Sequence, residues 1–294
     1  MNSDQTITTD DALIYTVTSD GVAHITLNKP KIRNAFDNHI IERITDSFKQ
    51  AEQDPVVALI LLSSNGSHFS AGADLNWMKS MVNASYEENL LDAQKLAKLM
   101  STINHCAKPV VTKVRGAAYG GGVGLIACSD IVLAEQTSSY ALSEVKLGLS
   151  PATIAPFVID AIGARAARRL FLTGEVFNAE KALNLGLVSE VVAPELLDEA
   201  VDTVILKLLN NGPKALCKTK LLIEEINTQP RGERLTDYTC RLIAELRVSD
   251  EGQEGLSAFL EKRKPNWSSR SAPATSTDAS QPSTSATSPS TKAD

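Results

Sequence analysis

The chain has 294 residues, of which 43% are hydrophobic, and a formal net charge of -6. This length and apolar content suffice for a buried core in one large domain or two small ones, so we expect a globular enzyme. The negative charge argues against general binding to nucleic acids or anionic membranes, which requires a dominant basic face.

The N-terminus and the cysteines indicate the compartment. Residues 1–11 lack the basic and apolar regions of a signal peptide, and no apolar stretch approaches the length of a membrane span. We therefore expect a flexible segment at 1–11 and a cytoplasmic protein that does not bind membranes. The four cysteines are far apart, without a C-x-x-C pair, which argues against zinc and against a disulfide framework: Cys106, Cys128, Cys217 and Cys240.

The first half of the chain alternates between strand and helix patterns. Two apolar runs at 12–17 and 22–27 flank Ser19-Asp20-Gly21, which predicts a hairpin. Further elements follow from apolar spacing: helices at 39–53 and 86–103, and strands at 57–62, 109–114 and 131–134. This alternation predicts an α/β fold.

Beyond Pro151 the pattern becomes helical. Helices are predicted at 154–162, 164–171, 179–185, 194–209, 212–226, 235–248 and 251–261. We assign residues 12–193 to the core and residues 194–267 to a C-terminal helical cap. Residues 268–294 are rich in Ser, Thr and Pro without apolar periodicity, so we expect a disordered tail.

Two glycine-bearing loops each join an apolar strand to a helical pattern. Their sequences are FSAGADL at 69–75 and GAAYGGGVGL at 116–125. One backbone N–H from each loop could converge on a single oxygen, because glycine allows close approach and a helix N-terminus carries partial positive charge. Such a pair of donors forms an oxyanion hole.

With the segment YALSEVKLGL at 140–149, these loops make residues 12–267 resemble the crotonase, or enoyl-CoA hydratase/isomerase, family. The resemblance implies a ββα spiral core that binds an acyl-CoA thioester, with no cofactor beyond the coenzyme A of the substrate. It also implies a homotrimer or a dimer of trimers, in which the helical cap packs between subunits. The amides of Ala73 and Gly121 would stabilise the thioester enolate.

One glutamate matches the family's acid/base residues. Hydratases of this family typically use two glutamates, and here Glu144 matches the second while Gly124 replaces the first. Glu144 lies between Leu142 and Val145, so we expect partial burial, which raises a carboxyl pKa toward the range useful for acid/base catalysis.

The missing glutamate leaves the reaction open. A single glutamate is typical of enoyl-CoA isomerases, because a 1,3-proton shift needs no water. The longer sequence around Glu144 resembles bacterial methylglutaconyl-CoA and carboxygeranoyl-CoA hydratases, which act in leucine and acyclic-terpene breakdown. We therefore rank hydration first and isomerisation second. Decarboxylation of a methylglutaconyl thioester and non-catalytic acyl-CoA binding remain alternatives.

The resemblance also implies residues that bind the substrate. Basic residues near both ends of the folded part would contact the coenzyme A phosphates: Lys31, Arg33 and Lys262. Lys146 would share the face of Glu144 on an extended segment and meet a second substrate carboxylate, and Trp77 would line the acyl pocket. The remaining substrate-binding residues expected from the family are Ala71, Asp74, Leu75, Gly120, Gly124 and Phe259.

A metal site is not expected. Asp74 and Asp130 have no second cluster of ligands near them in sequence, and enolates in this family are stabilised by amides. We expect Asp130 to cap or pair locally.

Overall fold

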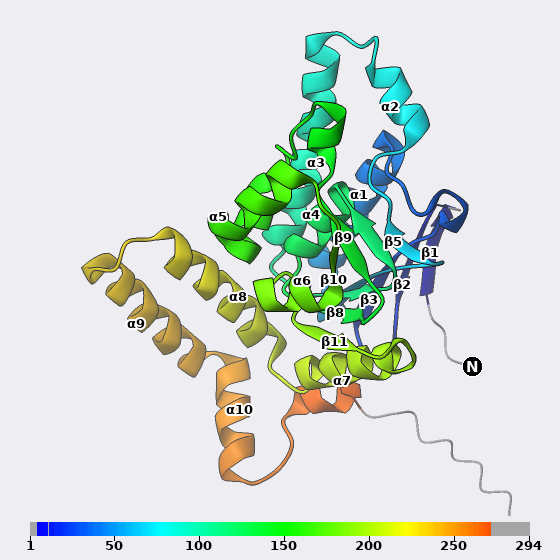
Figure 1. The fold of residues 1–294 in the computed structure, drawn as a ribbon. Helices are drawn as coiled ribbons and strands as arrows, with labels where there is room; N and C mark the ends of the chain where they lie inside the picture. Colours follow the sequence, from blue (N-terminus) through cyan, green and yellow to red (C-terminus); the bar gives the residue numbers. More distant parts are fainter. Residues whose placement is uncertain (1–4, 11, 272–294) are drawn as a thin grey trace, which may run out of the picture.

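The structure is a computed structural model that describes residues 5–10 and 12–271 (Figure 1). Its larger sheet has seven strands in the order β1-β2-β3-β4-β6-β8-β11. The strands β1, β2 and β3 are antiparallel, and β3, β4, β6, β8 and β11 are parallel. Their bounds are β1 Gln5–Asp10, β2 Leu13–Val17, β3 Val22–Leu27, β4 Leu59–Ser64, β6 Val110–Val114, β8 Ile131–Glu135 and β11 Glu190–Val192.

Strand β1 differs from the expected flexible N-terminus. Residues 5–10 pair with β2 in an antiparallel register that shifts between Thr6 and Thr9. The segment is rich in β-branched residues, which suit an edge strand, but it is too polar to reveal a buried face. Residues 1–4 and 11 lie outside the described residues. The predicted hairpin is confirmed as β2 and β3.

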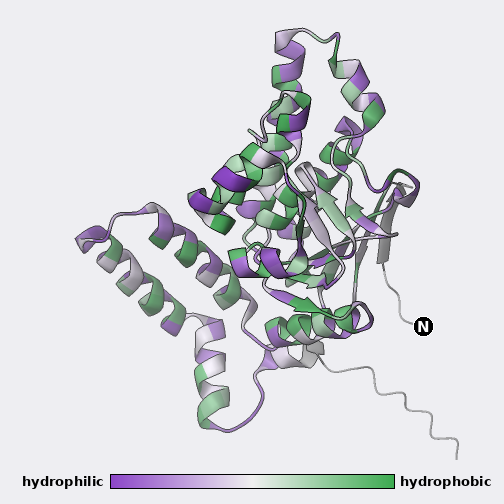
Figure 2. Ribbon diagram, in the orientation of Figure 1, coloured by the Kyte–Doolittle hydropathy of each residue, from purple (hydrophilic) through white to green (hydrophobic). Residues whose placement is uncertain are grey.

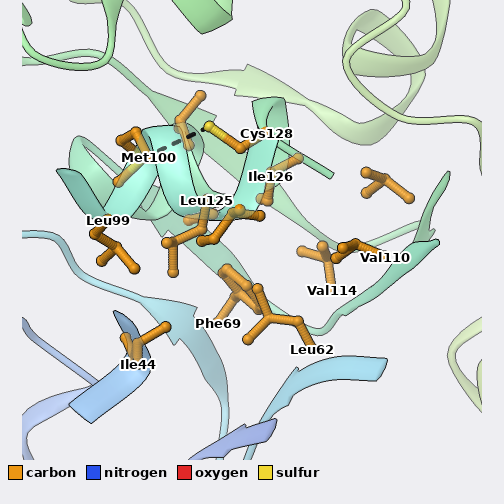
Figure 3. Packing of buried hydrophobic residues seen from close by; sticks show 14 of the residues in the cluster. Ile44, Leu62, Phe69, Leu99, Met100, Val110, Val114, Leu125, Ile126 and Cys128 are labelled. Carbon is orange, nitrogen blue, oxygen red and sulfur yellow. Dashed lines mark hydrogen bonds between the residues drawn. The ribbon is translucent and has the colours of Figure 1, made fainter. Parts of the chain in front are cut away.

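The larger sheet is buried on both faces, because successive side chains of a strand point to opposite sides. On β4, Ile60 and Leu62 belong to the main core, whereas Leu59 and Leu61 pack with helix α7 (Leu197–Leu209). The main core also contains residues of the helices α1 (Asn38–Gln53), α3 (Tyr86–Asn104) and α4 (Gly121–Ala127). Figure 3 shows Leu62 and Phe69 close to Leu125 of α4. This arrangement explains why β4 reads as a continuous apolar run.

A second, smaller sheet determines where the glycine loops lie. Its four strands are ordered β10-β9-β7-β5, with β5 His68–Ser70, β7 Ala117–Tyr119, β9 Ser139–Ala141 and β10 Phe177–Asn178. The two glycine loops follow the buried strands β4 and β6, but the short strands β5 and β7 lie between each buried strand and its loop. Strands of two or three residues are too short to show a period of two in sequence.

Helices surround the sheets in the first two thirds of the chain. Their bounds are α1 Asn38–Gln53, α2 Leu75–Met81, α3 Tyr86–Asn104, α4 Gly121–Ala127, α5 Ala155–Thr173 and α6 Ala179–Leu185, with the 3-10 turns η1 Pro30–Ile32 and η2 Glu144–Leu147. The two helices predicted on either side of Gly163 form one element, α5, which is interrupted by the non-helical φ of 75° at that glycine.

The cap divides into a part packed on the core and a part that extends away from it. The elements are η3 Pro194–Leu196, α7 Leu197–Leu209, α8 Pro213–Thr228, α9 Glu233–Val248, α10 Asp250–Leu260 and η4 Asn266–Ser271. Helix α7 covers the second face of the larger sheet, whereas α8, α9 and α10 project from the body (Figure 1). Of these three helices only Leu242 and Ala258 are buried.

The projecting helices carry alternating apolar and polar residues (Figure 2). Their exposed apolar side chains include Ile223, Ile243, Val248, Leu256, Phe259 and Leu260. No helix in the described part of the chain is both long and apolar enough to cross a membrane. Residues 272–294, most of the expected tail, lie outside the described residues, and residues 268–271 belong to η4.

Candidate active site

The two glycine loops contact each other. Strands β5 and β7 are parallel neighbours, so the loops that follow them leave the small sheet at the same edge. Gly72 has a φ of 86°, and a Cβ atom added to it would lie 3.0 Å from the carbonyl oxygen of Tyr119 and 3.9 Å from the Cα atom of Gly120. The contact leaves no room for a side chain at position 72.

The N–H groups of Ala73 and Gly121 are both available. The backbone N–H of Phe36 donates to the Gly72 oxygen and the N–H of Asp74 donates to the Phe36 oxygen, each at 2.7 Å, so the Ala73 N–H lies between two paired groups. Gly121 is the first residue of α4, where an N–H has no acceptor within the helix. Neither N–H has an acceptor among the residues that the structure describes.

The carboxyl group of Glu144 lies beside the second loop. A Cβ atom added to Gly120 would be 3.1 Å from Glu144 Oε1, and Gly120 has a φ of 49° that suits glycine. Glu144 Oε2 is buried and has no hydrogen-bond partner in the described part of the chain. Burial raises the pKa of this carboxyl above its ordinary value. Glu144 is half-buried, as expected, and its carboxyl group lies against the second glycine loop.

Apolar side chains surround the position of the absent glutamate. Gly124 is buried in α4, and a Cβ atom added to it would lie 2.5 Å from Ile154 Cγ2 and 3.0 Å from Met100 Sδ. Met100 also contacts Cys128, at 3.8 Å between the sulfur atoms (Figure 3). Position 124 is thus part of the core rather than an empty place in the site.

The residues after the first loop mainly shape helix α2. Asp74 Oδ1 accepts hydrogen bonds from the N–H groups of Asn76 at 2.8 Å and Trp77 at 3.1 Å, as an N-cap does. The indole N–H of Trp77 donates to Asp92 Oδ1 at 3.1 Å, and its ring packs against the main core. Leu75 is 72% exposed.

The basic residues near the N-terminus lie next to the first loop. Lys31 and Arg33 are exposed, and the Arg33 carbonyl accepts a hydrogen bond from the Ala71 N–H at 2.9 Å. The side-chain amide of Asn34 donates to the carbonyls of Asn65 and His68, both at 2.9 Å. The backbone of Arg33 therefore lies against the first loop, and Lys31 precedes it by two residues in η1.

The site residues expected from sequence do not include Asn34 and Phe36, which the structure places next to the first loop. Both belong to the segment between β3 and α1 that pairs with the first loop, and Asn34 has a φ of 53°, a conformation that asparagine tolerates. The segment RNAF at 33–36 carries a short polar residue between a cation and apolar residues, which is a weak turn signal. Its pairing with the loop is a long-range contact that no local pattern reveals.

Three expected substrate-binding residues lie elsewhere. Lys146 does not share the face of Glu144, because η2 is a 3-10 turn rather than an extended segment; the Lys146 side chain instead lies along Gly174, with its Cε atom 3.1 Å from a Cβ added there. Phe259 is 80% exposed on α10, and Lys262 follows that helix. Helix α10 lies on the far side of the chain from α2 (Figure 1).

Asp130 links β6 to α8. Its carboxylate accepts hydrogen bonds from the Val110 N–H at 2.7 Å and from Lys220 Nζ at 2.8 Å. These partners are 20 and 90 residues away, so the expected local cap or pair is replaced by contacts between distant segments.

A cavity of about 660 Å³ lies beside α2 and α3, and its lining includes Asn38, Met81 and Asp92. Neither Glu144 nor the two loops line it, so we do not treat it as the catalytic site.

Comparison with known proteins agrees with this geometry. Residues 17–270 match the family described as enoyl-CoA hydratase/isomerase. A solved enoyl-CoA hydratase from Shewanella pealeana is 44% identical, with a TM-score of 0.84 over 87% of this chain and 96% of that one. The trans-2-decenoyl-[acyl-carrier-protein] isomerase of Streptococcus mutans is 31% identical over 260 residues, 88% of this chain and 98% of that protein.

A third relative, the crotonyl-CoA hydratase of Syntrophomonas wolfei, is 30% identical over 251 residues, which cover 85% of this chain and 95% of that protein. Residues 17–270, which match the family, include both glycine loops and Glu144 and extend through the cap. The family resemblance and the crotonase-type α/β fold expected from sequence are confirmed. The chain belongs to the enoyl-CoA hydratase/isomerase family.

Proposed function

We propose that this protein adds water across the double bond of a 2-enoyl-CoA thioester, with Glu144 as its only acid/base residue. The observation that carries the proposal is the buried carboxyl of Glu144 beside Gly120, next to a loop contact that leaves the Ala73 and Gly121 N–H groups unpaired. Hydratases among the relatives support this choice.

In this mechanism the two N–H groups bind the thioester oxygen. The Glu144 carboxylate takes a proton from water as the water oxygen forms a bond to Cβ, and the electron pair of the double bond moves onto the thioester as an enolate. The protonated Glu144 then returns that proton to Cα. The raised pKa of Glu144 suits a group that must accept and release a proton in one cycle.

Isomerisation is the second candidate, and the packing of Gly124 favours it. Ile154 and Met100 fill the surroundings of position 124 with apolar groups, so no carboxylate there orients water. In an isomerase Glu144 would carry a proton between Cα and Cγ through a dienolate, and no oxygen atom would be added.

For the acyl group we propose 3-methylglutaconyl-CoA or a related branched, carboxylated enoyl-CoA. This choice rests on the sequence around Glu144. Lys146 does not support it as a partner for the second substrate carboxylate, because the Lys146 side chain lies along Gly174. We assign Lys31 and Arg33 to the coenzyme A end. Phe259 and Lys262 could reach a substrate only on another subunit, as in the proposed trimer or dimer of trimers.

Product analysis in labelled water distinguishes these reactions. The purified protein is incubated with straight and branched 2-enoyl-CoA and 3-enoyl-CoA thioesters, including 3-methylglutaconyl-CoA, in ¹⁸O-labelled water. Hydration incorporates one labelled oxygen, isomerisation moves the double bond without label, and decarboxylation releases carbon dioxide. Binding without any of these products would contradict the proposal and support a non-catalytic acyl-CoA-binding protein.

A further inference from the structure

Phe36 contacts both loops that carry the proposed donors. Its backbone brackets Ala73 through hydrogen bonds to Gly72 and from Asp74, each 2.7 Å long. Its ring lies on the second loop, because a Cβ atom added to Gly121 would be 2.9 Å from both Cδ2 and Cε2 of the ring. Phe36 is 2% exposed, so neighbouring residues hold the side chain in this position.

We propose that Phe36 is a positioning residue that sets the separation and direction of the Ala73 and Gly121 N–H groups. The inference rests on the proposed function of these groups as an oxyanion hole. The backbone of Phe36 holds one donor and its ring supports the other, so the distance between the donors depends on the length and rigidity of this side chain. An oxyanion hole loses its advantage when its donors are not preorganised.

The contact at Gly121 explains why the ring matters. Gly121 has no side chain with which to pack, so the ring of Phe36 is the surface against which the first turn of α4 rests on this side. At the next residue, a Cβ atom added to Gly122 would be 3.0 Å from Ser70 Cβ, so Ser70 of the first loop limits the movement of this turn as well. Shortening the ring therefore leaves space into which Gly121 can move, away from the thioester oxygen.

The test compares Phe36→Leu with Phe48→Leu in the full-length protein. Phe48 lies within α1 and is fully buried in the same core cluster, so it reports the general cost of shortening a core phenylalanine. We expect Phe36→Leu to lower kcat by about 10- to 100-fold with KM near the wild-type value, since a shift of about 1 Å in a catalytic group can cost about 100-fold.

A spectroscopic readout separates positioning from general destabilisation. Acetoacetyl-CoA can ionise to an enolate that absorbs in the ultraviolet, and donors aimed at its thioester oxygen favour the enolate when it binds. We expect wild type and Phe48→Leu to show the enolate band at a lower pH than Phe36→Leu does. If Phe36→Leu does not fold, Phe36→Met, which is closer in volume, is measured in the same way.

The outcomes are distinguishable. If the wild-type protein shows the enolate band but turns over no enoyl-CoA, the proposed reaction is contradicted, and the effect of Phe36 on the band can still be measured. If the wild-type protein turns over substrate but shows no enolate band, the positioning proposal is contradicted and the proposed reaction stands. A folded Phe36→Leu with wild-type kcat and enolate band would overturn the proposal, as would an equal loss of kcat in Phe48→Leu.

Discussion

Ile154 occupies the space that a side chain at position 124 would need: a Cβ atom added to Gly124 lies 2.5 Å from Ile154 Cγ2. Ile154 is 2% exposed and immediately precedes α5, so its contact with Gly124 joins α4 to α5. The glycine is therefore required for packing, whatever its role in the reaction. A second glutamate at this position would require α5 or the Ile154 side chain to move.

Substitution of Gly124 should destabilise the protein through this contact. We expect Gly124→Ala to lower the free energy of unfolding by about 1–3 kcal/mol, a typical cost of overpacking. Gly124→Glu should cost more, because it also buries a carboxyl group without a partner. Urea denaturation measures both changes.

The double variant Gly124→Ala/Ile154→Ala provides the control, since it removes the clashing Cγ2 atom. A double-mutant cycle should show that the two substitutions together cost less than the sum of their separate costs. If Gly124→Ala alone were as stable as wild type, position 124 would have room for a side chain. A glutamate at this position would then be sterically allowed, and the argument from packing would be wrong.

Replacing Glu144 should separate binding from chemistry. Glu144→Gln retains the size of the side chain but cannot exchange a proton, so we expect turnover to fall by about 100- to 10,000-fold. Acyl-CoA binding measured by calorimetry should be retained. The control is Glu190→Gln, at an exposed position on β11. Unchanged turnover in the Glu144 variant would assign the proton transfer to another group.

The raised pKa of Glu144 predicts a specific dependence of stability on pH. Burial makes the folded protein bind the Glu144 proton more tightly than the unfolded chain does. Ionisation of Glu144 therefore reduces stability as the pH rises from the ordinary carboxyl range through the raised pKa, and it has no effect below that window. Glu144→Gln should become more stable relative to wild type across the window, with a constant difference above it.

Denaturation of both proteins at matched pH values measures this difference, because contributions of the other titrating groups cancel. The pH dependence of kcat should report the ionisation of Glu144 as well. If the carboxylate is the active form, kcat rises with pH through the raised pKa of Glu144. A stability difference that does not change with pH would contradict the assigned direction of the pKa shift.

Deleting the donor at position 73 should reduce the rate without removing an internal hydrogen bond. The Ala73 N–H has no acceptor within the described residues, so Ala73→Pro removes only the proposed contact with the substrate and the freedom of φ. We expect a loss of about 100- to 1,000-fold in kcat. Tyr86→Pro, at the exposed first position of α3, is a matched control because proline is tolerated there.

Circular dichroism would establish that both proline variants fold. If a folded Ala73→Pro variant retained wild-type kcat, the Ala73 amide would have no part in an oxyanion hole.

The projecting helices predict self-association. Val248, Phe259 and Leu260 are 78%, 80% and 77% exposed on α9 and α10, which is unusual for large apolar side chains of a monomer. We expect a trimer or a dimer of trimers in sedimentation velocity experiments, and smaller species for the double variant Val248→Glu/Leu260→Glu. Val56→Glu, on a loop before β4, provides an exposed control. A monomeric wild type at micromolar concentration would contradict this prediction.

Local patterns in the sequence were sufficient for the main elements. The apolar runs at 12–17 and 22–27 and the helical spacing of 39–53 and 86–103 correspond to β2, β3, α1 and α3, because the burial of side chains imposes apolar patterns directly on the chain. The glycines of the two loops and the apolar neighbours of Glu144 likewise identified the family and the half-buried glutamate.

Contacts between distant segments could not be derived from such patterns. The strands β5 and β7 are too short to show a period, and Lys146 was misplaced because η2 is a tight turn rather than an extended segment. The sequence shows that position 124 is glycine, but only the tertiary structure shows that Ile154 fills its surroundings. The same is true of Phe36, since steric contact depends on the positions of residues in space and not on their separation along the chain.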